Sequence, residues 1–157
     1  MSYADGTNVS VEKSKSEIES MLLKHGADQF VSGYETGRAM IQFRKDGRFI
    51  RFLLKLPDPN EERFKTTPSG KWTVTPERAQ KNWEQACRAK WRALALCIKA
   101  KLEAVAAEIT TFETEFMPHT VMPDGKNFSQ HALPAIEAAY KSGKVPKLLT
   151  FEGASNG

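Results

Sequence analysis

The chain has 157 residues, a net charge of +4, 40% hydrophobic and 27% charged residues, which fits one ordinary globular domain. No apolar run approaches the roughly 18 residues that a membrane-spanning helix needs, and the polar start lacks the apolar stretch of a signal peptide. We therefore expect a protein that does not enter a membrane and stays in the cytoplasm.

A first helix is predicted over residues 11–25, after a polar N-terminus, residues 1–10, that we expect to be disordered. Apolar residues recur in this segment at helical spacing. Ser14 and Ser16 each precede a glutamate by three residues, which is the spacing of a capping box near a helix start. Gly26 is a typical C-terminal stop.

The next part of the chain predicts three successive antiparallel strands, at Gln29–Tyr34, Arg38–Lys45 and Arg48–Leu56. Asp46-Gly47, between the last two strands, is a strong signal for a two-residue hairpin turn. Such a turn pairs Lys45 with Arg48 and thereby fixes the register of the whole hairpin.

This register gives the hairpin two different faces. One face is wholly apolar and must be buried; it consists of Ala39, Ile41, Phe43, Ile50, Phe52 and Leu54. The other mixes cations with large apolar side chains; it consists of Arg38, Met40, Gln42, Arg44, Phe49, Arg51, Leu53 and Lys55.

A long loop is predicted over residues 58–75, because Pro57 ends the third strand and further prolines follow. Loops of this length are usually functional or mobile. This one contains Arg63, Phe64, Lys65, Lys71 and Trp72.

Thr75-Pro76-Glu77 predicts the start of a long helix, which we expect to run to about Ile109. An apolar stripe should pack on the buried sheet face; it comprises Trp83, Cys87, Trp91, Leu94, Ile98, Leu102, Val105 and Ile109. A basic stripe should face solvent or a ligand; it comprises Arg78, Lys81, Arg88, Arg92 and Lys99. Cys87 and Cys97 lie about 15 Å apart along this helix, too far for a disulfide, so we expect two thiols in a reduced interior.

The C-terminal part is less regular. Phe112, Phe116, Val121 and Met122 are expected in the core, a short helix is predicted over 129–141, and the tail, 146–157, is expected to be loose. The overall prediction is a single α+β domain over residues 11–145, with a three-stranded antiparallel meander packed on one long helix and short flanking helices.

Positive charge is concentrated in the middle of the chain. Residues 38–101 hold 16 Lys and Arg against 6 Asp and Glu, a net of +10, whereas the rest of the chain has a net charge of −6. This split indicates an anionic partner for the middle segment. The alternative is that the two regions neutralise each other within the fold.

Motifs for catalysis or cofactor binding are absent. There is no phosphate-binding loop, dinucleotide glycine pattern or HExxH, and the three histidines are scattered, so we expect no enzyme, no cofactor and no metal site. A nuclease built on Glu113, Glu115 and His119 is the enzymatic alternative, but a solvated acidic edge explains these residues better.

The basic strand face and the basic helix stripe together predict a nucleic-acid-binding surface, in which cations contact phosphates and an aromatic ring stacks on bases. Its expected residues are Arg38, Arg44, Phe49, Arg51, Lys55, Arg88, Arg92 and Lys99. Both rows would have to lie on the same side of the fold.

Several stretches resemble an uncharacterised family of phage and prophage proteins. They are residues 38–57 with a G-R-x-I-R-F core, WRALALCIKAKLEAV from Trp91, ITTFETEF from Ile109, and Met122-Pro123-Asp124-Gly125. The resemblance implies a mobile-element context and no particular activity. The order of one helix, three antiparallel strands and a long basic helix is also similar to phage single-strand annealing proteins, such as the lambda beta protein and RecT.

The leading hypothesis is a phage-type nucleic-acid-binding protein, with single-stranded DNA preferred, that acts in replication or recombination. The alternative is a small interaction protein that docks on and inhibits a host protein, or forms a homo-oligomer. Such a protein would show an exposed apolar patch, for which Phe112, Phe116 and Met117 are the candidates.

Overall fold

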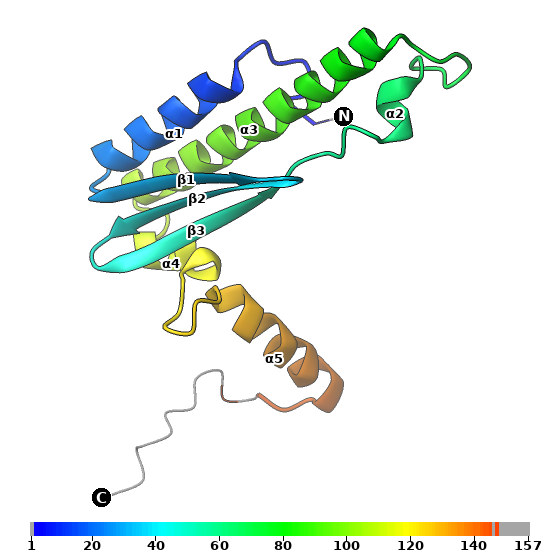
Figure 1. The fold of residues 1–157 in the computed structure, drawn as a ribbon. Helices are drawn as coiled ribbons and strands as arrows, with labels where there is room; N and C mark the ends of the chain where they lie inside the picture. Colours follow the sequence, from blue (N-terminus) through cyan, green and yellow to red (C-terminus); the bar gives the residue numbers. More distant parts are fainter. Residues whose placement is uncertain (1, 146, 148–157) are drawn as a thin grey trace, which may run out of the picture.

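The computed structural model describes residues 2–145 and 147, and it confirms an α+β fold with a three-stranded antiparallel meander (Figure 1). Its elements, in chain order, are α1 (Val11–Lys24), β1 (Gln29–Glu35), β2 (Arg38–Lys45), β3 (Arg48–Lys55), α2 (Glu62–Lys65), α3 (Pro76–Ala106), α4 (Phe112–Phe116), the short 3₁₀ helix η1 (Met117–His119) and α5 (Phe128–Ser142).

The start of α1 differs in detail from the prediction. The hydroxyl of Ser10 caps the helix by accepting a hydrogen bond from the backbone N–H of Lys13 at 3.1 Å. Ser14, expected near a capping box, lies inside the helix and is fully buried. The small serine there fits the side of α1 that packs along α3.

The predicted register of the β2–β3 hairpin is confirmed, from Lys45 opposite Arg48 to Ala39 opposite Leu54. Both turn residues have positive φ, 51° at Asp46 and 76° at Gly47, as a two-residue type I′ turn requires. β1 joins the other side of β2, so the strand order is β1-β2-β3.

One face of the sheet is covered by helices and forms the core. In Figure 1, α1 and α3 run side by side along the sheet, and α4 packs near the C-terminal end of α3. The predicted apolar face is buried in this layer, where Phe43 makes edge-to-face contacts with Phe112 at 6.3 Å and with Phe116 at 5.9 Å. Trp91, Leu94, Ile98 and Leu102 of α3 belong to the same cluster, as predicted.

α3 ends earlier than expected. Glu108 adopts a left-handed conformation with φ of 60°, and the N–H of Ile109 donates to the carbonyl of Ala104 at 3.0 Å. Ile109 therefore leaves the apolar stripe and is 80% exposed. The two cysteines also differ from each other: Cys87 is buried as expected, but Cys97 is exposed.

Residues 2–9, expected to be disordered, have defined contacts with α3. Ala4 is 3% exposed, and the side-chain amide of Gln85 donates to the carbonyls of Asp5 and Thr7 at 3.0 and 2.8 Å. The expected loose tail, 146–157, lies outside the described residues apart from Lys147.

α5 confirms the predicted last helix, with a capping box of Asn127 and Gln130 at its start and Gly143 at φ 71° at its end. It extends away from the sheet in Figure 1. Ala132 is its one buried residue, and it exposes Leu133, Ile136 and Tyr140. Within the described residues, no helix has the length and apolar character required to cross a membrane.

Candidate nucleic-acid interface

The face of the sheet opposite the helices, called the open face below, carries the predicted mixture of cations and apolar side chains. None of these side chains belongs to the described hydrophobic core. β1 extends the face with Gln29, Val31, Gly33 and Glu35, by alternation along the strand. A hollow of about 390 Å³ lies on it, lined in part by Gly33, Met40, Leu53, Arg38 and Arg51.

Two cations lie directly opposite each other at one end of the open face. Arg38 of β2 pairs in register with Lys55 of β3, and like charges at such positions destabilise a sheet. Arg38 also forms an ion pair with Glu35 at 2.8 Å, but both side chains are exposed, so the pair contributes little. Lys55 makes no ion pair with any described residue. An anion bound here would relieve the repulsion.

Arg51 lies in the middle of the open face and is held by neutral acceptors. Its Nε donates to Oε1 of Gln42 at 3.1 Å, and its Nη1 donates to the carbonyl of Gly125 at 3.0 Å. These bonds orient the guanidinium without cancelling its charge, so it remains able to bind an anion.

Arg44 and Phe49 are less available than expected. Arg44 donates to both carboxylate oxygens of Asp28, at 2.9 and 3.1 Å, and this guanidinium lowers the pKa of the Asp28 carboxyl. The guanidinium also lies 5.9 Å from the Phe49 ring centroid. Phe49 is half-buried, so its ring is not an open platform for stacking a base.

The basic residues of α3 are not on the open face, because α3 packs on the opposite face of the sheet. Arg92 forms an ion pair with Glu17 of α1, and Arg88 donates to Oε1 of Gln85. Both are half-buried, which contradicts the expectation that they face solvent; α1 packs beside this stripe. Lys99 is exposed, in a hollow shared with α1. The two predicted rows of cations therefore do not form one surface.

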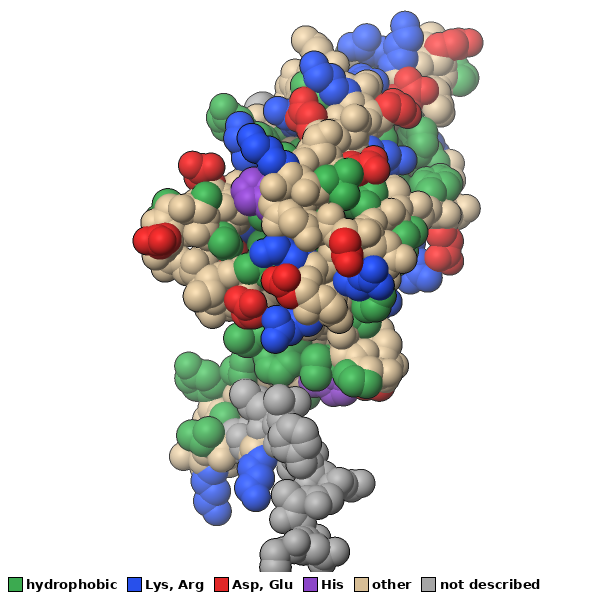
Figure 2. Space-filling model, turned by 90° about the vertical axis from the view of Figure 1, so that its left-hand side faces the viewer, with side chains coloured by type: hydrophobic (Ala, Val, Ile, Leu, Met, Phe, Trp, Pro, Cys, Tyr) green, Lys and Arg blue, Asp and Glu red, His purple; other side chains and the backbone are tan. Residues whose placement is uncertain are grey.

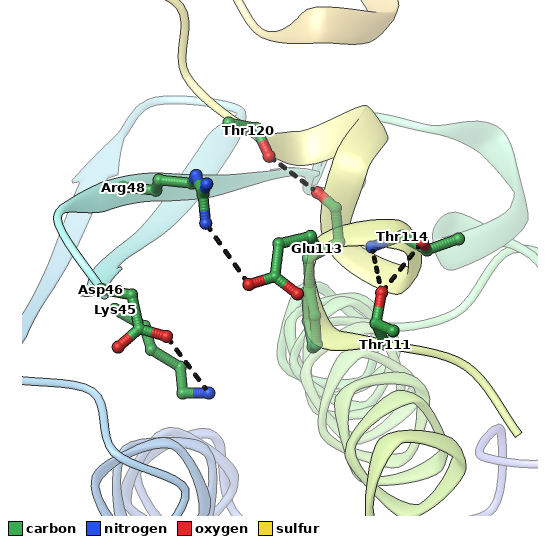
Figure 3. A network of polar contacts seen from close by, with 8 residues as sticks. Lys45, Asp46, Arg48, Thr111, Glu113, Thr114 and Thr120 are labelled. Carbon is green, nitrogen blue, oxygen red and sulfur yellow. Dashed lines mark hydrogen bonds and ion pairs between the residues drawn. The ribbon is translucent and has the colours of Figure 1, made fainter. Parts of the chain in front are cut away.

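The cations at the hairpin end are neutralised locally. Figure 3 shows Arg48 and Glu113 pointing toward each other, at 3.4 Å, and Lys45 beside Asp46, at 3.8 Å. Figure 2, a view from this end, shows basic and acidic side chains interspersed over the main body, with hydrophobic side chains gathered toward the C-terminal helix.

The acidic residues considered for a nuclease are each engaged elsewhere. Glu113 contacts Arg48, and Glu115 pairs with Lys101 at 3.2 Å. His119 stacks on Phe52 with ring centroids 4.1 Å apart, and burial, together with the charge of Lys101, lowers its pKa. In the described part of the chain, no three His, Cys, Asp or Glu residues are placed to hold a metal ion.

The patch expected around Phe112, Phe116 and Met117 is only partly exposed. Phe112 and Phe116 are buried in the core, whereas Met117 is exposed. Exposed apolar side chains gather instead on α5. Comparison with family models, with curated proteins and with solved structures finds no match to this chain, so functional arguments rest on its own surfaces.

Proposed function

We propose that this protein binds single-stranded nucleic acid, with DNA preferred, across the open face of its sheet. The observation that carries the proposal is the cross-strand pair Arg38–Lys55 beside Arg51, on the sheet face opposite the described core helices. Glu35 pairs with Arg38, so Lys55 and Arg51 supply the charge that described acids leave unneutralised. A fold that keeps two cations opposite each other has an energetic reason to bind an anion there. A phosphate backbone supplies regularly spaced anions.

The apolar side chains of the open face favour a single strand over a duplex. Leu53 is 59% exposed and Val31 is 45% exposed, and the hollow beside Gly33 leaves room over Met40. Unpaired bases can place their apolar faces on such a surface, whereas bases within a duplex are already stacked. The role that we propose in replication or recombination rests on the similar order of elements in phage single-strand annealing proteins.

The direct test is a fluorescence-anisotropy titration with single- and double-stranded DNA of the same sequence, at about 50 mM salt and micromolar protein. We expect tighter binding to the single strand. Absence of binding to DNA and to the corresponding RNA under these conditions would refute the proposal.

Lys55→Glu makes this test specific, because it should separate binding from stability. It turns a like-charge pair into an attractive one with Arg38, so the free energy of unfolding should rise by about 0.2–1 kcal/mol while the affinity for DNA falls. Lys13→Glu, on the exposed side of α1, makes the same change in net charge and should leave the affinity nearly unchanged. Equal losses in both variants would indicate a non-specific charge effect.

The second candidate, a small interaction protein that inhibits a host protein, is favoured by α5. Leu133, Ile136 and Tyr140 share one side of this helix and are 62%, 44% and 89% exposed. Apolar residues at such spacing are typical of a helix that binds a groove. Under this alternative, Leu133→Asp with Tyr140→Asp should abolish binding of a stoichiometric protein partner, and Lys55→Glu should not.

A further inference from the structure

The loop between α2 and α3 contains a small hairpin that holds a tryptophan in solvent. Thr66 and Thr73 form an antiparallel bridge, and the N–H of Thr67 donates to the carbonyl of Trp72 at 2.8 Å. A turn ending at Gly70, with φ of 74°, closes the hairpin. Trp72, on the returning side of the hairpin next to Thr73, is 70% exposed. The segment expected to be an unstructured loop is therefore a defined projection.

Cations flank this projection in the sequence. Residues 63–81 contain five Lys and Arg and one acid, Glu77. Four of these cations make no ion pair with a described residue: Lys65, Lys71, Arg78 and Lys81. The fifth, Arg63, pairs with Glu61 at 2.6 Å. In Figure 1, the start of α3 and this hairpin extend beyond the N-terminal end of α1.

Two neighbouring hollows lie between Lys55 and the hairpin. One hollow, of about 710 Å³, contains Lys55 at the end of β3 together with Arg63 and Lys90. A second hollow contains Lys65 and Thr73 of the hairpin, and the two hollows share Pro59 and Asn60.

Three acids, Asp58, Glu61 and Glu62, lie along this path, and Glu61 is paired with a cation. The carboxylate of Asp58 accepts the N–H of Asn60 at 2.8 Å, and Glu61 accepts the N–H of Asp58 while it pairs with Arg63. Asp58 and Glu62 form no ion pair with a described residue, so this path carries both signs of charge, and the excess of cations lies on residues 63–81.

We infer that the hairpin is a second contact site for single-stranded nucleic acid, in which Trp72 stacks on a base and Lys65 and Lys71 contact phosphates. This inference rests on the proposed function and extends its path from Arg38 and Lys55 toward α2. An exposed indole accepts any base because every base has a π-face, and nearby cations supply the charge attraction. A lone indole offers little apolar area for insertion into a lipid surface, so nucleic acid fits the hairpin better.

The test compares Trp72→Ala and Trp72→Phe with the wild type, using fluorescently labelled oligo-dT in anisotropy titrations. Loss of one stacked base should weaken binding by about 5- to 150-fold in Trp72→Ala, with a smaller loss in Trp72→Phe. Because Trp72 is exposed, both variants should retain wild-type circular dichroism and melting temperature.

Intrinsic fluorescence supplies a second readout. Oligo-dT should quench the tryptophan emission of the wild type, and Trp72→Phe should lose most of this quenching while it still binds, since Trp91 is buried and Trp83 half-buried. Wild-type affinity in Trp72→Ala would overturn the inference and leave the proposed function standing. Absence of wild-type binding to oligo-dT and to the corresponding RNA would overturn both. Binding of the wild type to vesicles of anionic phosphatidylglycerol, but not to oligo-dT, would assign the hairpin to membranes instead.

Discussion

The cationic side chains of this protein differ in whether an acidic side chain already neutralises their charge in the folded state. Arg44 is bound by both oxygens of Asp28, and Lys101 is paired with Glu115 while it lies 6.0 Å from the Phe116 ring centroid. Arg51 contacts only neutral acceptors among its described partners, and Lys55 faces another cation. Removing Arg51 or Lys55 should therefore affect binding more than stability.

The lowered pKa of His119 predicts that the stability of the protein depends on pH. Its pKa in the folded protein lies below the ordinary value of 6.5, through burial against Phe52 and the charge of Lys101. Protonation therefore favours the unfolded chain, and the stability contribution is complete above about pH 6.5 and is lost as the pH falls through the folded pKa. In urea titrations, we expect the free energy of unfolding to decrease as the pH is lowered from about 7.5 to about 5.5.

His119→Phe serves as the matched variant, because it keeps an aromatic ring on Phe52 and removes the titrating group. Its unfolding free energy should depend less on pH over the same interval. An NMR titration of the wild-type imidazole should place the His119 pKa below that of a histidine in an unstructured peptide. An unchanged pH slope in His119→Phe would assign the dependence to another group.

The positive φ of Gly47 predicts that a β-branched residue at this position lowers the stability of the protein. Its φ of 76° is unfavourable for a β-branched side chain, although a Cβ there would meet no atom within 4 Å. Gly47→Val should therefore lower the free energy of unfolding by about 1 kcal/mol or more through backbone strain alone. Gly6→Val, at another open position without a positive φ, is the control for the added side chain. A wild-type urea midpoint in Gly47→Val would contradict the turn.

The long helix α3 packs against both the sheet and α1. Leu94 is 9% exposed and belongs to the cluster that contains Ile41 and Phe52. Leu94→Ala should destabilise the protein by about 2–5 kcal/mol, by loss of buried contacts and formation of a cavity. Leu133→Ala, on the exposed side of α5, should change stability by less than about 0.5 kcal/mol.

Hydrogen exchange tests the same packing without a substitution. Backbone amides in the middle of α3, residues 87–102, should be protected close to the global free energy of unfolding, because they lie beneath the buried stripe. Amides of α5 should exchange faster, since Ala132 is the one residue that this helix buries. Equal protection in the two helices would contradict this description.

The β2–β3 hairpin was predictable because its information is local: a two-residue turn and a period of two place every side chain on a face. The start of α3 was predictable for the same reason, from Thr75 and Pro76. The partial burial of the basic stripe of α3 was not predictable, because Arg92 forms an ion pair with Glu17, which lies 75 residues away in the sequence. The hairpin around Trp72 was also missed, since two short threonine-containing segments show no strand alternation.

The basic middle segment and the acidic outer segments of the chain partly neutralise each other. Five ion pairs join the two regions: Glu17–Arg92, Asp28–Arg44, Glu35–Arg38, Glu113–Arg48 and Glu115–Lys101. The segment nevertheless has a net charge of +10, so an excess remains, and it includes Arg51, Lys55 and the cations around Trp72. The sequence shows that positive charge is concentrated in residues 38–101, but only the fold shows which of these cations are paired with acids.

This distribution of charge predicts how binding depends on salt. Each phosphate contacted by a single strand contributes a slope of about −0.7 to the dependence of log affinity on log salt. Because Arg51 and Lys55 are not neutralised by described acids, Arg51→Ala with Lys55→Ala should reduce the magnitude of the slope for oligo-dT by about 1.4. Lys13→Ala with Lys24→Ala removes the same charge from exposed positions on α1 and should leave the slope unchanged. Anisotropy titrations at four salt concentrations measure all three proteins, and equal slopes for the two double variants would place the phosphate contacts away from the open face.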